Sequence, residues 1–530
     1  MDRIKGLLHG TARTEMRRRI NLNIRYREDL RRDGKWKKVI SSVLGNLAGK
    51  RHQPGIDLAM IETDDGVILS DDKDIHNAVT DQFERRWFNA PEECQGSLHH
   101  GDRWKDSINS RDHFMRDTAY TDAPEELRQL IYKAIHNVPT RDTVRQEIQE
   151  ACSDPPTLAE FEIAIQRAKT NSVAGMSGCS YNQLKKWPPE LIRNLHYCLS
   201  RLWRAQLTPD WWTSRWLVTI PKKLEDIPTV SNMRPLILVE AVRKLWCRLL
   251  LQRILTVWQR HNLLHRFQHG FISGLSTMTA STIFINMLED AIENKRPLHT
   301  CTWDITRAFD SVSKNVMRLA WSRLGVPDDW VRWLIEMDEF GMTVVRTPHA
   351  VNIWNKSGRQ GFTKRGEGQA QSDSDKADGF TAERGTGQGD VTSPTCWAAI
   401  FDILLTALHM DIVQNREMRY SSAGANVGCE EGETAYADDL LSCARTPEAL
   451  QRKADIVSTF CMIMGLKLST AKLRRFVLAH SGMENDDSLV TIVHRYGGTE
   501  AEDGTCWQSD EVHASTEGAL EYLGGKYDVD

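Results

Sequence analysis

The amino-acid sequence predicts an α+β fold, and three patterns support this. From about Pro155 the chain alternates between strand-like and helical patterns. Two short apolar runs flank the adjacent acids Asp438 and Asp439, which is typical of two strands joined by a tight turn. The segment from Leu298 runs as a strand into Asp304 and continues as a helix that ends at Gly325. With 530 residues, the chain is long enough for roughly two to four domains or subdomains.

The composition is that of a folded protein. Hydrophobic residues make up 40% and charged residues 26% of the chain, with 17 Trp and 14 Phe. The 11 Cys are an odd number without a C-x-x-C pair, which fits neither a secreted disulfide framework nor a zinc site. We therefore expect a reducing compartment, nuclear or cytoplasmic. The longest apolar segment is short and contains Asp402, so it predicts a buried helix and no membrane partner.

The N-terminal part is predicted to contain two regions. Residues 1–54 form a basic arm, because 15 Lys and Arg stand against five acids before residue 52. This arm is either a polyanion-binding segment or a solvated helix face. Residues 55–154 form a linker or accessory region with a turn at Asp65 and Gly66, a helix beginning near Ile75, and a polar linker over residues 90–122.

Residues 155–530 form the main domain. Within it, residues 355–384 are poor in apolar residues and rich in Gly, Ser, Asp and Lys, which predicts a flexible insertion that interrupts the domain without dividing it. Residues 481–530 form an acidic stretch, which we interpret as a surface or spacer region.

Three acids are the strongest candidates for chemistry. Adjacent acids at a turn, such as Asp438 and Asp439, are usually only turn formers. Asp304 at the end of a second strand changes that interpretation, because a carboxylate there projects from a rigid element. Three acids that converge from two strands would suit two Mg²⁺ ions, with Mn²⁺ as a substitute, because hard cations prefer carboxylate oxygens. Such an ion pair can activate a 3′ hydroxyl and stabilise a leaving pyrophosphate.

The ordered segments of this chain resemble those of reverse transcriptases, most closely the enzymes of non-LTR (LINE-type) retrotransposons. Residues 57–75 also resemble the linker that precedes the polymerase in these elements. A single motif is only weakly specific, but this many motifs in the family's order are a specific signal. The matching segments are NSVAGMSGCSYNQLKK, LVTIPKK with MRPLILVEAVRKL, QHGFISGLST, WDITRAFDSV (motif A), RGTGQGDVTSP (motif B), YADD (motif C), GLKLSTAK (motif D) and EYLGG (primer-grip motif E).

This resemblance implies a right-hand polymerase architecture: an antiparallel palm sheet backed by helices, with helical fingers. The chain ends shortly after Gly525, so we expect the thumb to be missing, and an upstream endonuclease with it, as in a piece of an element protein. The sequence also departs from the family pattern, with Asp390 and Thr392 in motif B and with Ala174, Met176 and Ser177 in the early fingers motif.

The resemblance also implies roles for individual residues. Asp304 and Asp438 would be direct metal ligands, with Asp439 the third member of the site. Lys472 would be a general acid that protonates pyrophosphate, with a purely structural role as the alternative. Lys222 and Arg234 would hold the incoming triphosphate; without the motif, each would be read as a solvated surface cation.

Further residues are expected around the nucleotide. Phe309 would lie beneath its sugar and exclude a 2′ hydroxyl, with a core position as the alternative. Gln388 lies between two glycines, where a backbone without Cβ atoms can approach the nucleotide. Asp310 is either a helix N-cap or a site ligand, and we favour the cap. Ser393 and Pro394 would occupy the N-cap and first position of the next helix.

We therefore expect an RNA-directed DNA polymerase whose partners are an RNA template, a DNA primer and dNTPs, and we leave the oligomeric state open. One alternative is an RNA-dependent RNA polymerase, because Asp304 and Asp310 also fit its acid spacing; an aromatic residue at 309 and YADD in place of GDD argue against it. The second alternative is a non-catalytic RNA-binding protein that retains the polymerase fold.

Overall fold

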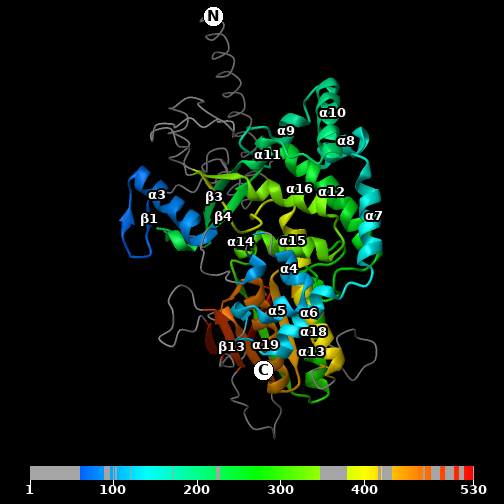
Figure 1. The fold of residues 1–530 in the computed structure, drawn as a ribbon. Helices are drawn as coiled ribbons and strands as arrows, with labels where there is room; N and C mark the ends of the chain where they lie inside the picture. Colours follow the sequence, from blue (N-terminus) through cyan, green and yellow to red (C-terminus); the bar gives the residue numbers. More distant parts are fainter. Residues whose placement is uncertain are drawn as a thin grey trace, which may run out of the picture.

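The computed structural model describes most of the main domain and part of the region before it (Figure 1). The basic arm 1–54 and most of the insertion 355–384 lie outside the described residues, as do several parts of 481–530. The described residues are 60–88, 96–99, 101, 104–120, 122–170, 172–222, 227–346, 379–415, 419–420, 432–469, 472–478, 490–495, 507–512, 519–523 and 525–528.

The predicted acids lie at one end of a four-stranded antiparallel sheet whose strand order is β12-β5-β10-β9. In its register Leu440 lies opposite Trp303. Asp439, which precedes Leu440, and Asp304, which follows Trp303, therefore lie at the same end of the sheet. The strands are β5 (Leu298–Trp303), β9 (Glu433–Tyr436), β10 (Asp439–Ala444) and β12 (Arg474–Leu478).

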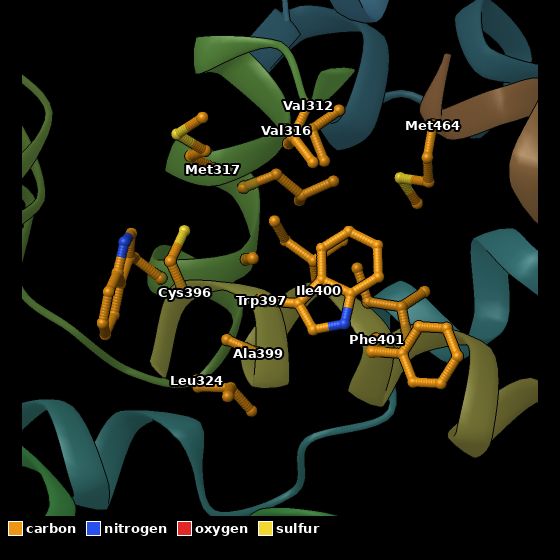
Figure 2. Packing of buried hydrophobic residues seen from close by; sticks show 14 of the residues in the cluster. Val312, Val316, Met317, Leu324, Cys396, Trp397, Ala399, Ile400, Phe401 and Met464 are labelled. Atoms are coloured by element: carbon orange, nitrogen blue, oxygen red, sulfur yellow. The ribbon is translucent and has the colours of Figure 1, made fainter. Parts of the chain in front are cut away.

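Helices α15 (Lys314–Arg323), α18 (Ser393–Gln414) and α19 (Pro447–Met464) build the core behind this sheet. Figure 2 shows Val316 and Met317 of α15 in the same buried cluster as Trp397 and Ile400 of α18. Met464, at the end of α19, lies beside the same cluster. The sheet edge that bears the acids thus rests on a rigid apolar layer.

The residues before Pro155 belong to the same core. Helix α6 (Glu125–His136) packs against α18 and α19, and α7 (Arg141–Ser153) packs against α12 (Ala241–Arg260). In the expected polar linker, the described residues form α4 (Trp104–Asn109) and α5 (Arg111–Arg116), whose residues Trp104, Ile108 and Phe114 are buried. The prediction of a plain linker over 90–122 was wrong there, because these widely spaced apolar residues supply one buried face.

A second four-stranded sheet has the order β4-β3-β7-β8, and its β3 and β7 are parallel. Helix α3 (Asp72–Phe83) covers part of it with Ile75, Val79 and Phe83, as the helical spacing predicted. The predicted turn at Asp65 and Gly66 joins β1 (Ile61–Glu62) to β2 (Ile68–Leu69). The strands of the second sheet are β3 (Arg215–Pro221), β4 (Met233–Leu238), β7 (Met342–Arg346) and β8 (Gly379–Thr381).

Helices α8 to α10 form the end of the molecule drawn at the top of Figure 1. The C-terminal residues contribute two hairpins, β13–β14 and β15–β16. These elements are α8 (Leu158–Arg167), α9 (Tyr181–Leu184), α10 (Pro189–Ala205), α11 (Asp210–Thr213), α13 (Thr277–Glu293), α14 (Ala308–Ser311), α16 (Asp328–Glu339), β6 (Ile305–Thr306), β11 (Lys467–Leu468), β13 (Val490–Arg495), β14 (Trp507–Val512), β15 (Ala519–Tyr522) and β16 (Gly525–Asp528).

Helix α18 is long and apolar enough to cross a membrane, but 83% of its most apolar window is buried inside the fold. Its acid Asp402 accepts hydrogen bonds from the Arg323 guanidinium at 2.6 Å and from the backbone N–H of His265 at 2.6 Å. A buried carboxylate with these partners is stable in a protein core, so the sequence-based prediction of a buried helix is confirmed.

Candidate active site

The adjacent acids lie at a two-residue turn between β9 and β10. Tyr436 and Asp439 are paired across the hairpin, so Ala437 and Asp438 form its tip. Ala437 has a φ of 59°, whereas Asp438 has a negative φ, which is the pattern of a type II′ turn. Asp438 is half-buried and Asp439 is exposed. The hairpin predicted from the sequence is therefore present, and it presents both carboxylates at the end of the sheet.

Asp304 joins them from the neighbouring strand. It follows β5 and is held by the hydrogen bond from the Ser469 N–H to its backbone oxygen, at 2.8 Å. Its carboxylate oxygens accept hydrogen bonds from Lys472 Nζ at 3.0 and 3.1 Å. The short pairing of β11 with β6 brings motif D to this position, and Gly465, in a left-handed conformation, ends α19 just before it. The structure thus brings Asp304, Asp438, Asp439 and Lys472 together.

The carboxylates influence one another electrostatically. Burial raises the pKa of Asp438 above its usual value, and the charge of Asp304 raises it further, while Lys472 opposes the shift. Although Asp439 as a whole is exposed, partial desolvation of its carboxylate, followed by the charges of Asp438 and Asp304, raises its pKa to about 6. Asp438 and Asp439 are therefore more costly to ionise, in part because neighbouring carboxylates are close, which is a typical feature of a site built for cations.

The donor set fits a hard divalent cation. Among the described residues, no three His, Cys, Asp or Glu side chains lie close enough together to hold a metal ion as they stand. Charged carboxylates repel each other, and Lys472 neutralises Asp304 instead. Asp304 and Asp438 nevertheless offer carboxylate oxygens at one edge of a rigid sheet, and a divalent ion there would offset the burial and the charge of Asp304 that raise the pKa of Asp438.

Lys472, which contacts Asp304, belongs to a group of four cations that come from different segments. Burial lowers the pKa of Lys222, and the positive charges of Lys472, Arg307 and Arg234 lower it further. These three cations are therefore close enough to Lys222 to act on its charge. Lys222 follows β3, and Arg234 is an exposed residue of β4 opposite Ile220. Such a concentration of positive charge is suited to a polyphosphate.

Arg307 is a site residue that the sequence reasoning missed. It has a φ of 53° and precedes the short helix α14, only three positions after Asp304. The signal that could have found it is a cation within motif A itself. Its left-handed backbone is unusual for a residue other than Gly, Asn or Asp, and such strain is concentrated at functional sites.

The motif B loop is hydrogen-bonded to α14, which follows Asp304, and to strand β4. Gln388 Nε2 donates to the Asp310 carboxylate at 2.9 Å, and the Gln388 backbone oxygen accepts from the Ile237 N–H at 2.7 Å. A Cβ atom on Gly389, which has a φ of 111°, would lie 2.7 Å from the Ile237 oxygen. The backbone around Gln388 therefore makes a close approach, as expected, but the observed partner is strand β4 of the protein rather than a nucleotide.

Two expectations about helix caps were wrong. Asp310 is buried within α14, and its carboxylate accepts from Gln388 rather than capping a helix. Thr392 is the N-cap of α18, and Ser393 occupies the first turn, where its hydroxyl donates to the Thr386 and Gly387 backbone oxygens at 2.5 and 2.8 Å. In each case the side chain binds the motif B loop, a tertiary contact that local sequence rules do not include.

Phe309 is half-buried beside this loop. Its ring lies against Trp397, with centroids 5.3 Å apart, and meets the edge of Phe271 at 6.2 Å. Its backbone oxygen accepts from the Thr386 N–H at 2.8 Å. The ring is thus held in a stiff aromatic layer and is partly accessible, a placement that suits either a sugar gate or the edge of the core.

A buried polar network supports the strands below the acids. Trp303 Nε1 donates to Ser442 Oγ at 3.0 Å, and Ser442 Oγ donates to Glu433 at 2.6 Å. Lys453 of α19 pairs with Glu433 at 2.5 Å and donates to the Cys443 backbone oxygen at 2.7 Å. The network joins β5, β9 and β10 to α19, so it fixes the strands that carry Asp304 and Asp438.

Comparisons with known proteins identify the family of this chain. The family model described as "Reverse transcriptase (RNA-dependent DNA polymerase)" matches residues 220–525, which include every predicted site residue. The chain also aligns over 52% of its length with an apo telomerase from Candida tropicalis, truncated from its C-terminal domain, at 11% identity and a TM-score of 0.33. That TM-score is too low to establish a common fold.

The relatives are polymerase proteins of retrotransposons. The R2 Pol polyprotein of Popillia japonica is 25% identical over 62% of this chain, and that of Nasonia vitripennis is 23% identical over 60%. The RNA-directed DNA polymerase of the mobile element jockey from Drosophila funebris is 25% identical over 33% of this chain. The alignments cover 40%, 26% and 19% of these relatives, so the chain spans less than half of their length. On this family match and these relatives, the chain belongs to the reverse transcriptase (RNA-dependent DNA polymerase) family and is of the non-LTR retrotransposon type.

Proposed function

We propose that this chain is an RNA-directed DNA polymerase that copies RNA into cDNA for a non-LTR retrotransposon. One observation carries the proposal: Asp304, Asp438 and Asp439 lie at the end of one sheet, and Lys472 on Asp304 also acts on the charge of Lys222, as Arg234 and Arg307 do. Acids that suit divalent ions beside cations that suit a triphosphate are what nucleotidyl transfer requires.

The family generally uses divalent metals, and we propose two Mg²⁺ ions here, with Mn²⁺ as a substitute. Asp304 and Asp438 would be the direct ligands, and exposed Asp439 would complete the site. When bound, the ions supply charge that activates the primer 3′ hydroxyl and stabilises the leaving pyrophosphate. The chain itself positions the carboxylates: strands β5 and β10 hold Asp304 and Asp438 at one end of the sheet, and the polar network of Trp303, Ser442 and Glu433 fixes these strands.

The cations have separate roles in this proposal. Lys222, Arg234 and Arg307 would hold and orient the triphosphate, since cations stabilise phosphoryl oxygens. Burial and the positive charges next to Lys222 lower its pKa. A bound polyanion would neutralise those charges and remove their part of the shift. Lys472 contacts Asp304 now. Once a metal ion neutralises that carboxylate, Lys472 would be available to protonate the leaving pyrophosphate.

The proposed partners are an RNA template, a DNA primer and dNTPs, and we propose a nuclear or cytoplasmic location. The alternatives differ in their products. An RNA-dependent RNA polymerase would extend the primer with ribonucleotides, and a non-catalytic protein would bind RNA without extending anything.

A primer-extension assay tests the proposed function. The purified chain is incubated with Mg²⁺ and a DNA primer annealed to an RNA template, with dNTPs in one reaction and rNTPs in the other. We expect extension with dNTPs that stops at the end of the template. Preferential extension with rNTPs would support the RNA polymerase alternative. Template binding without extension in either reaction would overturn the proposal in favour of a binding protein.

A further inference from the structure

Gln268 is a buried side chain that contacts the catalytic turn from another segment of the chain. It is only 1% exposed and lies between α12 and α13, 169 positions before Ala437. Its Nε2 donates to the Ala437 backbone oxygen at 3.1 Å, and its Oε1 accepts from the Ala437 N–H at 2.9 Å. One side chain therefore binds the peptide groups on both sides of Ala437, the residue directly before Asp438.

Backbone contacts around Gln268 hold the same segment against β9. The Ala435 N–H donates to the Phe267 oxygen at 2.8 Å, and the His269 N–H donates to the Ala435 oxygen at 2.7 Å. The Gly270 N–H donates to Gln268 Oε1 at 2.8 Å, which orients the amide. A Cβ atom on Gly270 would lie 2.2 Å from the Ala437 nitrogen, so the close approach requires glycine there.

Ala437 is the residue of the turn that most needs such support. Its φ of 59° lies in the left-handed region, which an L-residue with a Cβ atom adopts at a steric cost. A type II′ turn favours glycine at this position. Without a restraint, an alanine there would tend to leave the left-handed region, and the peptide group that leads into Asp438 would rotate with it.

We propose that Gln268 is a positioning residue of the polymerase: its amide holds Ala437 in the left-handed conformation and thereby fixes the direction in which Asp438 meets the metal ions. The proposal rests on the polymerase function proposed above. Glutamine is suited to this role because its planar amide holds a donor NH2 group beside an acceptor oxygen, and these match the C=O and N–H groups of one residue.

The test uses a substitution of similar size. Gln268→Met in the full chain removes both hydrogen bonds to Ala437 with little change in volume, and Gln268→Glu keeps the acceptor but loses the donor. Gln259→Met, at an exposed glutamine near the end of α12, is the matched control. Each protein is assayed for the Mg²⁺ dependence of primer extension. Mn²⁺ binding is measured by electron paramagnetic resonance with a dideoxy-terminated primer, RNA template and the next dNTP.

We expect Gln268→Met to raise the half-saturating Mg²⁺ concentration and to weaken Mn²⁺ binding by about tenfold, because it loses both buried hydrogen bonds to Ala437. Gln268→Glu should lie between the wild type and Gln268→Met, and it serves as the test if the methionine variant does not fold. Gln259→Met should behave as the wild type. Ala437→Gly should restore part of the metal affinity of Gln268→Met, because glycine adopts the left-handed conformation without a steric cost.

A purely structural role gives a different result. If Gln268 only stabilises the fold, Gln268→Met lowers the unfolding temperature but leaves the Mn²⁺ affinity of the folded protein unchanged, and Ala437→Gly rescues nothing; that result overturns the inference. A wild-type chain that does not extend primers would contradict the proposed function instead. Mn²⁺ binding would still compare the variants in that case, so the two failures are distinguishable.

Discussion

Four buried charges connect the motif B loop to the helices behind it. Arg243 of α12 pairs with Asp390 and, at 2.9 Å, with Asp338 of α16, and Arg215 of β3 pairs with Asp338 at 2.8 Å. The four side chains are between 0% and 6% exposed. Asp390, one of the departures from the family pattern, therefore points into the protein. We predict that it contributes to stability as the partner of Arg243.

The magnitude follows from what each substitution leaves behind. Asp390→Asn leaves Arg243 with Asp338 and with the backbone oxygens of Trp212 and Met337, so we expect a loss of about 3 kcal/mol in unfolding free energy. Arg243→Met leaves the buried Asp390 carboxylate without its cation and removes the bonds to both backbone oxygens. This substitution should cost about 5 kcal/mol.

The assay is urea unfolding followed by tryptophan fluorescence, applied to both single variants and to the double variant. In the double variant the second substitution removes a charge that has already lost its partner. The double variant should therefore cost about 5 kcal/mol, roughly 3 kcal/mol less than the sum of the single variants. Costs that simply add, or single effects below about 1 kcal/mol, would show that these charges do not depend on each other and would refute the reasoning.

Three further predictions concern other parts of the chain. Burial lowers the pKa of Lys314 to about 8 from its unfolded value of 10.5, so the unfolded chain binds more protons than the folded chain between these pH values. In urea unfolding, the unfolding free energy of the wild type should therefore rise by up to about 3 kcal/mol relative to Lys314→Met between pH 8 and pH 10.5. A difference that stays constant over this range would contradict the prediction. If Phe309 is a sugar gate, Phe309→Ala should raise the use of ribonucleotides relative to deoxynucleotides more than about tenfold in competitive incorporation, whereas unchanged selectivity with lower stability would make it a core residue. Deletion of residues 1–54 should flatten the salt dependence of RNA binding measured by fluorescence anisotropy, and an unchanged slope would assign those cations to a solvated face.

Local patterns were sufficient to predict the elements that carry the acids. The hairpin at Asp438 follows from two apolar runs around a polar pair, and the strand before Asp304 follows from its apolar residues. The buried nature of α18 was predicted from its composition and from Asp402, whose partner Arg323 only the structure identifies. These features depend on residues near one another in the sequence, where periodicity and turn chemistry are informative.

Contacts between distant segments were beyond that reasoning. Asp310 looks like a helix cap because it begins a polar stretch before a helix, yet its partner Gln388 is 78 positions away. Arg307 and Gln268 were missed because their roles depend on a backbone conformation and on the position of the catalytic turn. The polar appearance of residues 90–122 concealed Trp104 and Phe114, which are buried only because α6 and the main domain cover them.

The most direct measurement of the central claim is the rate of RNA-templated primer extension by Asp304→Asn and Asp438→Asn at saturating primer, template and Mg²⁺. Each substitution keeps the shape of the side chain and removes one negative charge from the proposed metal site. We predict that each lowers the rate at least about a thousandfold while primer–template affinity barely changes, because the charge stabilises mainly the transition state. Near-normal extension by either variant would contradict the assignment of these acids as the metal-binding centre.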